Sequence, residues 1–293
     1  MQYLNKHFLN CKAWLSFCLA LVSAFPVAST ACAAETAATS FPLMFDSRER
    51  LAKPDLSEVP RLRFLTSLDF PPFNFADQTG RPAGFQVDLA REICAELEIA
   101  AKCQIQAMPY EELQPALDKG EGEAIIGGVA VTPTLRDGYL FSRPFMALPA
   151  RFLRNAKVKI DPPASTALAG KDVGVIRGSA HEAMLKAYFP TLKPVPFADR
   201  SALFLALRES KVDAIFGDGV QLTFWAASTD SGHCCVLYDG PFVSEQFLGE
   251  GLSIMMKPED DVLQQAMDHA LLALSRKGRL KELYLRYFPY GLY

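Results

Sequence analysis

LQPALDKGEGEAIIGG, residues 113–128, and LFLALRESKVDAIFGD, residues 203–218, align without a gap. In each stretch an amphipathic run is followed by a short apolar run, a pattern that predicts a helix and then a buried strand. Five pairs of matched positions keep their chemical character: Ala116 with Ala206, Leu117 with Leu207, Glu123 with Asp213, Ile125 with Ile215, and Gly127 with Gly217. Two copies of one helix-then-strand unit predict two similar α/β lobes.

Short apolar segments and longer amphipathic segments alternate on both sides of this repeat. Alternation of this kind predicts mostly parallel sheets with helices on their faces. The expected strands are residues 61–67, 102–108, 123–131, 172–178 and 212–218, and the expected helices are residues 84–97, 110–120, 179–189 and 201–210. We therefore predict an α/β fold with two lobes, each a mostly parallel sheet flanked by helices.

The two lobes are expected to divide the chain unequally. Lobe 1 would comprise residues 61–150 and 246–293, and lobe 2 would comprise residues 151–245. The chain would then cross between the lobes near Ala150 to Leu153 and again near Glu245 to Glu250. Two strands at these crossings would act as a hinge.

The composition is that of a globular protein that binds no nucleic acid. The chain has 293 residues, of which 50% are hydrophobic and 22% charged, and its net charge is −3. This is enough apolar material for one large or two medium domains. The Lys and Arg residues are dispersed, so no basic patch indicates a nucleic-acid partner.

The amino terminus has the features of a secretory signal. Two lysines precede an apolar run at residues 13–25, and Ala31-Cys32-Ala33 then supplies the small residues that a signal peptidase reads. The run is short for a membrane span, so a cleaved signal at residues 1–33 is favoured over a retained anchor. A lipoprotein anchored at Cys32 is less favoured, because Ser29 is a poor occupant of the apolar position three residues before this cysteine.

An exported protein that is not embedded in the membrane follows from this signal, and we expect it in the periplasm. No later stretch is long and apolar enough for a transmembrane helix. Residues 34–60 are polar, contain three prolines and lack periodicity, so we expect an extended arm or linker there.

The cysteines agree with export. Cys94 comes late in an expected helix and Cys103 opens the next expected strand, and in an oxidising compartment we predict a disulfide between them. Cys234 and Cys235 follow His233, which raises the alternative of a soft metal site. Adjacent residues on a strand point to opposite faces, so buried thiols are favoured there, and we expect no metal and no cofactor.

SLDFPPFNF, residues 67–75, places three phenylalanines on a segment that its two prolines should keep from being either strand or helix. We predict that this loop is one wall of a ligand site. Phe70 could cover an apolar part of the ligand or contact a cation through its ring. Phe73 and Phe75 are more often core residues in such a position.

The loops that follow the expected strands carry groups suited to a zwitterion, and ligands of open α/β sheets bind at such strand ends. Arg136 can fork two hydrogen bonds onto a carboxylate. Ser179 and Glu182 have the spacing of a capping box, at a helix start whose free N–H groups favour an anion. Asp218 ends a strand and could hold an ammonium group. Taken singly, Arg136 could be a surface residue, Asp218 a turn cap and His181 a solvated side chain.

Residues 61–293 resemble the solute-binding proteins of ABC importers for polar amino acids, which have the type II periplasmic binding protein fold. The motifs that carry the resemblance occur in the family's order: DFPPFNF (69–75), GFQVDLAREIC (84–94), AIIGGVAVTPTLRDGYLFSRPF (124–145), GKDVGVIRGSA (170–180), KVDAIFGD (211–218) and SRKGRLKELYLRYFP (275–289). Together they span nearly the whole of the chain after the signal.

The resemblance implies a role for several residues. Phe70 would stack on the ligand side chain, Arg136 would hold the α-carboxylate, Gly178 and Ser179 would add backbone and hydroxyl donors, and Asp218 would hold the α-ammonium group. The complete set of expected ligand contacts is Phe70, Asn74, Gly128, Ala130, Arg136, Ile176, Gly178, Ser179, Ala180, His181 and Asp218. A disulfide like the expected Cys94–Cys103 pair also occurs in some members.

Three departures from the family's pattern bear on the ligand. The loop Gly127-Gly128-Val129-Ala130 has no hydroxyl group to share the ammonium. Arg136 lies one residue farther from Thr132 than is usual. Members that bind basic amino acids carry acids in the first loop, where this chain has Ser67 and Asn74. We therefore expect a neutral or polar amino acid and regard a cationic side chain as disfavoured.

Hinge closure would shut the lobes on the ligand, and the closed form would be recognised by an ABC transporter permease. The alternative within this fold is a periplasmic dehydratase acting on a prephenate-like acid, with Asp218 or Glu182 as proton donor. A ligand sensor for a membrane receptor is another alternative. The sequence contains no GxSxG, HExxH, phosphate-loop or dinucleotide motif, so we expect binding without catalysis.

Overall fold

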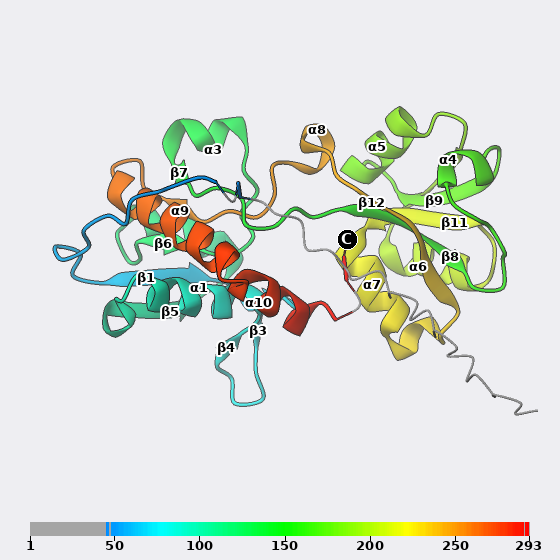
Figure 1. Cartoon of the computed structure of the whole chain (residues 1–293). Helices are drawn as coiled ribbons and strands as arrows, with labels where there is room; N and C mark the ends of the chain where they lie inside the picture. Colours follow the sequence, from blue (N-terminus) through cyan, green and yellow to red (C-terminus); the bar gives the residue numbers. More distant parts are fainter. Residues whose placement is uncertain (1–44, 47, 290, 293) are drawn as a thin grey trace, which may run out of the picture. The chain divides into compact units, whose positions relative to one another are not determined.

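The structure is a computed structural model that describes residues 45–46, 48–289 and 291–292 (Figure 1). The predicted signal at residues 1–33, with the alternative anchor at Cys32, lies outside these residues. Two five-stranded sheets form the framework, one with the strand order β5-β1-β6-β13-β7 and the other with the order β10-β9-β11-β8-β12. The prediction of a two-lobed α/β fold is therefore confirmed.

Lobe 1 is built on the first of these sheets. Its main strands are β1 (Leu62–Thr66), β5 (Cys103–Ala107), β6 (Ala124–Ile125), β7 (Leu140–Phe141) and β13 (Met255–Met256). Its helices are α1 (Phe85–Glu96), α2 (Leu113–Asp118), α3 (Pro133–Gly138), α9 (Asp261–Arg276) and α10 (Arg279–Tyr287), with short 3-10 turns at Ala100–Lys102 and Tyr110–Glu112. Within the sheet β1 pairs in parallel with β5 and β6, while β13 runs antiparallel to β6 and β7.

Lobe 2 is built on the second sheet in the same way. Its strands are β8 (Ala150–Asn155), β9 (Asp172–Ile176), β10 (Lys193–Phe197), β11 (Ala214–Asp218) and β12 (Cys235–Phe242). Its helices are α4 (Ala164–Ala167), α5 (Ala180–Tyr188), α6 (Arg200–Arg208), α7 (Gly219–Ala227) and α8 (Glu245–Leu248), with a 3-10 turn at Thr229–Ser231. Here β9 is parallel to β10 and β11, and β8 is antiparallel to β11 and β12.

The repeated unit of the sequence forms the same structure in both lobes. Helix α2 precedes β6, and helix α6 precedes β11. The Glu123 carboxylate accepts a hydrogen bond from the backbone N–H of Arg63 at 2.7 Å, and Asp213 accepts one from the N–H of Asp172 at 3.1 Å. Arg63 and Asp172 lie on β1 and β9, which are equivalent strands. The matched acids thus fasten the same two parts of each lobe together.

The first expected crossing between the lobes is misplaced. Ala150 to Leu153 belong to β8, because they pair with β11 and β12 inside the second sheet. The connection that precedes β8 is residues 142–149, and the return connection, residues 243–254, contains helix α8 rather than a strand alone. A single β-bridge between Met146 and Leu252 joins the two connections.

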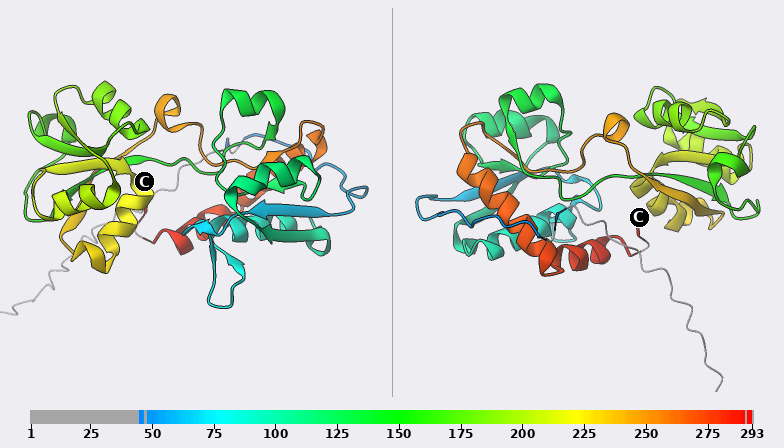
Figure 2. Two further views of the ribbon diagram at one scale, coloured as in Figure 1. Left: turned by 180° about the vertical axis from the view of Figure 1, so that it is seen from behind. Right: turned by 45° about the horizontal axis from the view of Figure 1, so that its top comes forward.

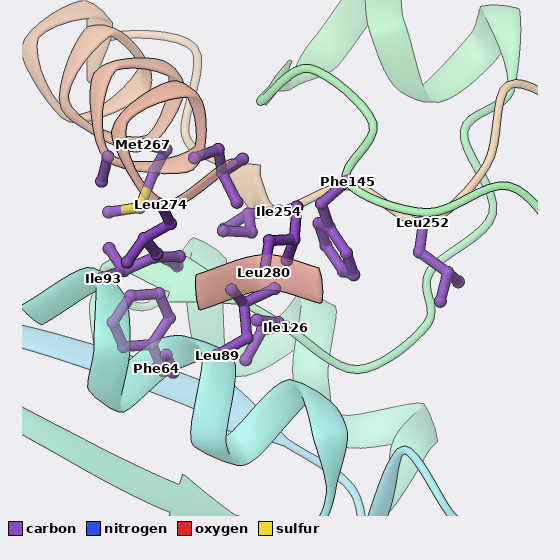
Figure 3. Packing of buried hydrophobic residues seen from close by; sticks show 14 of the residues in the cluster. Phe64, Leu89, Ile93, Ile126, Phe145, Leu252, Ile254, Met267, Leu274 and Leu280 are labelled. Atoms are coloured by element: carbon purple, nitrogen blue, oxygen red, sulfur yellow. The ribbon is translucent and has the colours of Figure 1, made fainter. Parts of the chain in front are cut away.

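The core of lobe 1 lies between its sheet and helices α1, α9 and α10. Helices α9 and α10 lie beside α1 in both orientations of the chain (Figures 1 and 2). Leu89 and Ile93 of α1 meet side chains from the sheet and from the two C-terminal helices (Figure 3). The other labelled members of this core cluster are Phe64, Ile126, Phe145, Leu252, Ile254, Met267, Leu274 and Leu280. Residues from both ends of the chain therefore complete this lobe.

The described part of the N-terminal extension packs on lobe 1. Phe45 and Leu56 are buried in the lobe 1 core. The Lys102 ammonium donates hydrogen bonds to the carbonyl oxygens of Leu56, at 3.2 Å, and Ser57, at 3.0 Å. The alternative of a free linker is therefore wrong for this part of the extension, which is an arm fastened to the lobe.

The aromatic loop at residues 67–75 is more regular than predicted. It contains β2 (Asp69–Phe70) and β3 (Asn74–Ala76), which form a small antiparallel sheet with β4 (Pro82–Ala83). The two prolines occupy the turn between β2 and β3, so they leave the strand hydrogen bonds intact. The chain between β3 and β4 extends away from the helices of lobe 1 (Figure 2). Phe73 is fully buried against Phe85 and Phe288, as predicted for a core residue.

Two disulfides join cysteines within residues 48–289. The predicted bond between Cys94 and Cys103 is confirmed and links the end of α1 to the start of β5. The prediction of free thiols at Cys234 and Cys235 is wrong, because the two residues are bonded to each other. Strand β12 begins only at Cys235, so the alternation of faces on which that prediction depended does not extend to Cys234.

Within the described residues no helix combines the length and apolarity that a membrane-spanning segment requires.

Candidate ligand-binding site

In lobe 2 the loops that follow the three parallel strands surround one pocket of about 450 Å³. Each of β9, β10 and β11 contributes from its carboxyl end, as expected for an open α/β sheet. The polar side chains of the lining are Ser179, His181, Asp199, Arg200, Asp218 and Gln221. The prediction had placed Ile176, Ser179, His181 and Asp218 at one site, and all four line this pocket.

Asp218 is a half-buried acid of this pocket. It is the N-cap of α7, where its side chain accepts a hydrogen bond from the backbone N–H of Gln221 at 2.9 Å. Burial raises the pKa of Asp218, and the hydrogen bond to Gln221 and the nearby charges of His181 and Arg200 counteract only part of this rise. Asp218 is therefore a helix cap that also lines the pocket, where a desolvated carboxylate would gain from an entering cation.

His181 lies beside Asp218 and is less exposed than predicted. Its ring is 6.3 Å from the ring of Phe216, with the planes nearly perpendicular. Burial lowers the pKa of His181, although the Asp218 carboxylate favours the protonated form. The alternative of a fully solvated side chain does not hold, because His181 is half-buried and lines the pocket. Its predicted contact with a ligand stays a prediction.

The predicted capping box at the start of α5 is present. Ser179 accepts a hydrogen bond from the backbone N–H of Glu182 at 3.1 Å, and the Glu182 carboxylate accepts one from the N–H of Gly178 at 2.6 Å. The Ser179 hydroxyl donates to the Ile176 carbonyl at 2.7 Å. The two donors expected to serve a ligand are therefore engaged within the chain. Ala180 is the first residue of α5, beside this cap.

In lobe 1 the strand-end loops form two neighbouring hollows that share Tyr110 and Glu111. The loops after β1 and β5 enclose about 570 Å³, and the loops after β5 and β6 enclose about 490 Å³. Acidic side chains line both: Asp69 and Glu111 line the first, and Glu111 and Asp118 the second. None of the described residues that line the two hollows is Lys or Arg.

Two lining residues differ in exposure, since Tyr110 is exposed and Ser67 is buried. Tyr110 keeps 46% of its surface exposed, which is unusual for a large aromatic side chain. The Ser67 hydroxyl is buried, and its oxygen has no hydrogen-bond partner among the described residues. Ala130, a predicted contact, lines the second hollow.

Phe70 and Gly128, both predicted site residues, are in contact. A side-chain Cβ at Gly128 would lie 2.9 Å from Cε1 of the Phe70 ring. Gly128 also has a φ of +77°, which L residues rarely adopt. The ring of Phe70 in turn stacks on Phe73 with a centroid distance of 4.7 Å. Only glycine therefore lets the aromatic ring rest on this strand end.

Six predicted contacts line none of the described pockets: Phe70, Asn74, Gly128, Arg136, Gly178 and Ala180. Asn74 is the one of these that is fully buried in the packing of lobe 1, and its amide donates a hydrogen bond to the Gln86 side-chain oxygen at 2.8 Å. Asn74 therefore links the small β2–β3–β4 sheet to α1 and does not reach the hollows of lobe 1.

Arg136 lies on α3, which Thr132 caps by accepting a hydrogen bond from the N–H of Leu135 at 3.2 Å. The guanidinium is already paired. Its Nε donates to Oε1 of Glu250 at 3.0 Å, and its Nη2 donates to Oε2 of the same carboxylate. Arg136 thus holds a carboxylate of the chain itself with both donors of one guanidinium edge, and its predicted contact with a ligand carboxylate stays a prediction.

Two groups of lining residues were missed by the sequence interpretation. They are Tyr110 and Glu111 after β5, and Asp199 and Arg200 after β10. The sequence could have indicated Tyr110 and Glu111, because they follow the predicted strand at residues 102–108 and ligands bind at such strand ends. No such indication existed for Asp199 and Arg200, because residues 193–197, which precede them, contain two prolines and were not predicted as a strand.

Comparison with known proteins relates this arrangement to ligand capture. Residues 62–290 match the bacterial extracellular solute-binding proteins, family 3. The putative ABC transporter arginine-binding protein 2 of Escherichia coli is 28% identical over 229 residues, covering 78% of this chain and 90% of that protein. The L-arginine-binding protein of Pseudomonas aeruginosa is 25% identical over 245 residues, covering 83% and 93%.

Solved structures agree with the fold. The second substrate-binding domain of a putative amino-acid ABC transporter from Streptococcus pneumoniae superposes with a TM-score of 0.67 at 19% identity, covering 78% of this chain and 99% of that one. An arginine transport periplasmic binding protein from Legionella pneumophila gives 0.53 at 26% identity, covering 78% and 99%. These neighbours have the type II periplasmic binding protein fold that the resemblance implied. The relatives described above are named as amino-acid-binding proteins. The chain belongs to family 3 of the bacterial extracellular solute-binding proteins.

Proposed function

We propose that this protein is a periplasmic receptor for an amino acid with a cationic side chain, which it delivers to an ABC importer without changing it chemically. The observation that carries the proposal is the acidic lining of the two lobe 1 hollows around Tyr110, with no basic residue among their described lining residues. Such a surface attracts a cation and repels an anion.

The choice of a cationic ligand departs from the expectation of a neutral one. That expectation considered only the first loop, where Ser67 and Asn74 replace the acids of basic-amino-acid binders. Asp69 and Glu111 supply carboxylates from neighbouring positions, and exposed Tyr110 offers a ring face for a cation. Relatives named as arginine-binding proteins support the same choice.

The remaining groups of the amino acid have partners on separate elements. Asp218 of lobe 2 would bind the α-ammonium group, and this contact would offset the cost of keeping its carboxylate desolvated. Arg136 would bind the α-carboxylate through its fork. Because these partners belong to different lobes, the ligand makes all its contacts only in a closed form, which it therefore favours.

Calorimetric titration with L-arginine, L-lysine, L-histidine and L-glutamine tests the proposal. We expect the basic amino acids to bind most tightly. Asp218→Ala should weaken binding by about 30-fold or more, the effect of removing one partner of a buried charge pair. The exposed Asp137→Asn variant, next to Arg136 on α3, is the control and should bind as the parent does.

Tighter binding of L-glutamine than of any basic amino acid would refute the cationic ligand but keep an amino-acid receptor. Turnover of the ligand during prolonged incubation would refute binding without chemistry. If Asp218→Ala binds as well as the parent protein, the assignment of the ammonium site is wrong.

A further inference from the structure

Arg136, the proposed binding residue for the ligand carboxylate, already forms an ion pair with Glu250 of the same chain. Both donors on one edge of the Arg136 guanidinium point to the Glu250 carboxylate, from Nε at 3.0 Å and from Nη2. The guanidinium carbon also lies 5.7 Å above the ring of Phe141. This two-pronged geometry is the one that a ligand α-carboxylate would require. One guanidinium edge cannot hold two carboxylates in this way at once.

Glu250 is placed by an unusual backbone. It stands between Gly249 and Gly251, whose φ angles are +77° and +113°. A Cβ at Gly251 would lie 2.5 Å from the Met146 carbonyl oxygen, so the chain passes too close to the other connection for any side chain. The adjacent Leu252 forms the bridge to Met146. The position of Glu250 is therefore coupled to the two connections between the lobes.

The pair is exposed, and this makes it exchangeable. Arg136 and Glu250 keep 43% and 40% of their side-chain surface accessible. Ion pairs in such surroundings contribute little net stability, because water and salt compete with them. An incoming carboxylate can therefore displace Glu250 at low cost. No buried charge would be left unpaired, since the released Glu250 can be hydrated.

We propose that Glu250 is an internal competitor for the ligand's α-carboxylate and thereby sets the affinity of the receptor. This inference rests on the proposed function, because it requires an amino-acid ligand at Arg136. The fork holds Glu250 when the site is empty and the ligand carboxylate when it is filled. Ligand binding then breaks the ion pair between Arg136 and Glu250. Because Glu250 lies in the return connection between the lobes, residues 243–254, ligand binding is thereby coupled to the conformation of that connection.

The test compares two probes, L-arginine and L-argininamide, which lacks the carboxylate charge. In Glu250→Gln the competitor is weakened, so L-arginine should bind about three- to five-fold more tightly, the scale of an exposed ion pair. L-argininamide offers Arg136 one neutral carbonyl oxygen in place of a carboxylate, so its affinity should change much less than that of L-arginine. In the Arg136→Ala background the Glu250→Gln substitution should no longer affect L-arginine.

Asp137→Asn is the matched control, because it removes the same charge one residue from Arg136 without touching the fork. It should not distinguish the two probes. Glu250→Ala repeats the test with a second side chain, and thermal melting of each variant checks that it is folded. Glycine is not introduced at this position, so the turn itself is unchanged.

An equal effect of Glu250→Gln on both probes, or weaker binding of L-arginine, would overturn the inference while leaving the receptor function intact. Unchanged binding of L-arginine would also overturn it. If the parent protein binds no amino acid at all, the proposed function itself fails, and the competitor role falls with it.

Discussion

The two lobes repeat one scaffold but end their matching strands in different chemistry. In lobe 1 strand β6 leads into Gly127-Gly128, and the ring of Phe70 rests on Gly128. In lobe 2 the matching strand β11 ends in Gly217-Asp218, and Asp218 immediately caps helix α7. The internal acids that fasten the repeats, Glu123 and Asp213, are alike in both. The two lobes thus share one arrangement of helix and strand, and they differ in the residues at the ends of the matching strands.

The difference has a local cause. Helix α7 starts at Gly219, directly after β11, so Asp218, the last residue of the strand, is also the N-cap of the helix. In lobe 1 the next helix, α3, starts only at Pro133, which leaves a loop after β6. A helix N-terminus favours a carboxylate, whereas a loop with a left-handed glycine allows close approach of an aromatic ring.

The largest expected effect concerns the disulfides, which also differ between the lobes. The Cys94–Cys103 bond closes a separation of nine residues, and its loss should cost about 2.5 kcal/mol in the free energy of unfolding by the loop-entropy relation. The Cys234–Cys235 bond closes almost no loop, so its loss should cost about 1 kcal/mol or less. Urea unfolding of the two double-serine variants measures both. Equal costs would contradict the loop argument.

A smaller effect is expected at the strand-end glycines. Gly128→Ala should destabilise the protein by about 1–2 kcal/mol, because its φ is +77° and Phe70 must move. Gly217→Ala is the lobe 2 control. Its Cβ would meet only Leu222, at 3.9 Å, so the change should be neutral or slightly stabilising. Thermal unfolding measures the stability of both variants. If Gly217→Ala lowers the free energy of unfolding as much as Gly128→Ala does, the two strand ends are equally constrained and the argument fails.

The smallest effect is expected at Asp218 in the absence of ligand. Asp218→Asn removes a desolvated charge but keeps a side-chain oxygen for the Gln221 N–H, so the unliganded protein should gain about 1 kcal/mol near neutral pH. The same variant should bind the ligand poorly. A loss of stability instead would mean that the charged cap outweighs the cost of burial.

The pH dependence of this gain has a defined sign. Because the pKa of Asp218 is raised in the folded protein, its stabilising contribution is present below its ordinary value of 3.8 and lost as the pH rises through the folded-state value. The advantage of Asp218→Asn should therefore grow as the pH rises and vanish in acid. His181 acts oppositely: its pKa is lowered, so its contribution is present above 6.5 and lost as the pH falls through the folded-state value. Unfolding measured from pH 4 to pH 8 in both proteins checks the trend.

The repeat made the framework predictable, because helix-then-strand periodicity and the matched apolar positions are local properties of the sequence. Arg136 illustrates what remained hidden. Its capacity to fork onto a carboxylate followed from its chemistry, whereas its partner Glu250 lies 114 residues away and could not be found from spacing. Asn74 was misjudged for a similar reason, since its burial against Gln86 depends on how the small sheet packs on α1.

The order of strands in the sheets has a consequence for biogenesis. Every strand of the lobe 2 sheet lies within residues 150–242, whereas the lobe 1 sheet has β13, at residues 255–256, between β6 and β7. A polypeptide that emerges from its amino end therefore supplies a complete second sheet before the first can close. Until helices α9 and α10, residues 261–287, have been synthesised, the apolar side chains of lobe 1 that these two helices cover stay exposed.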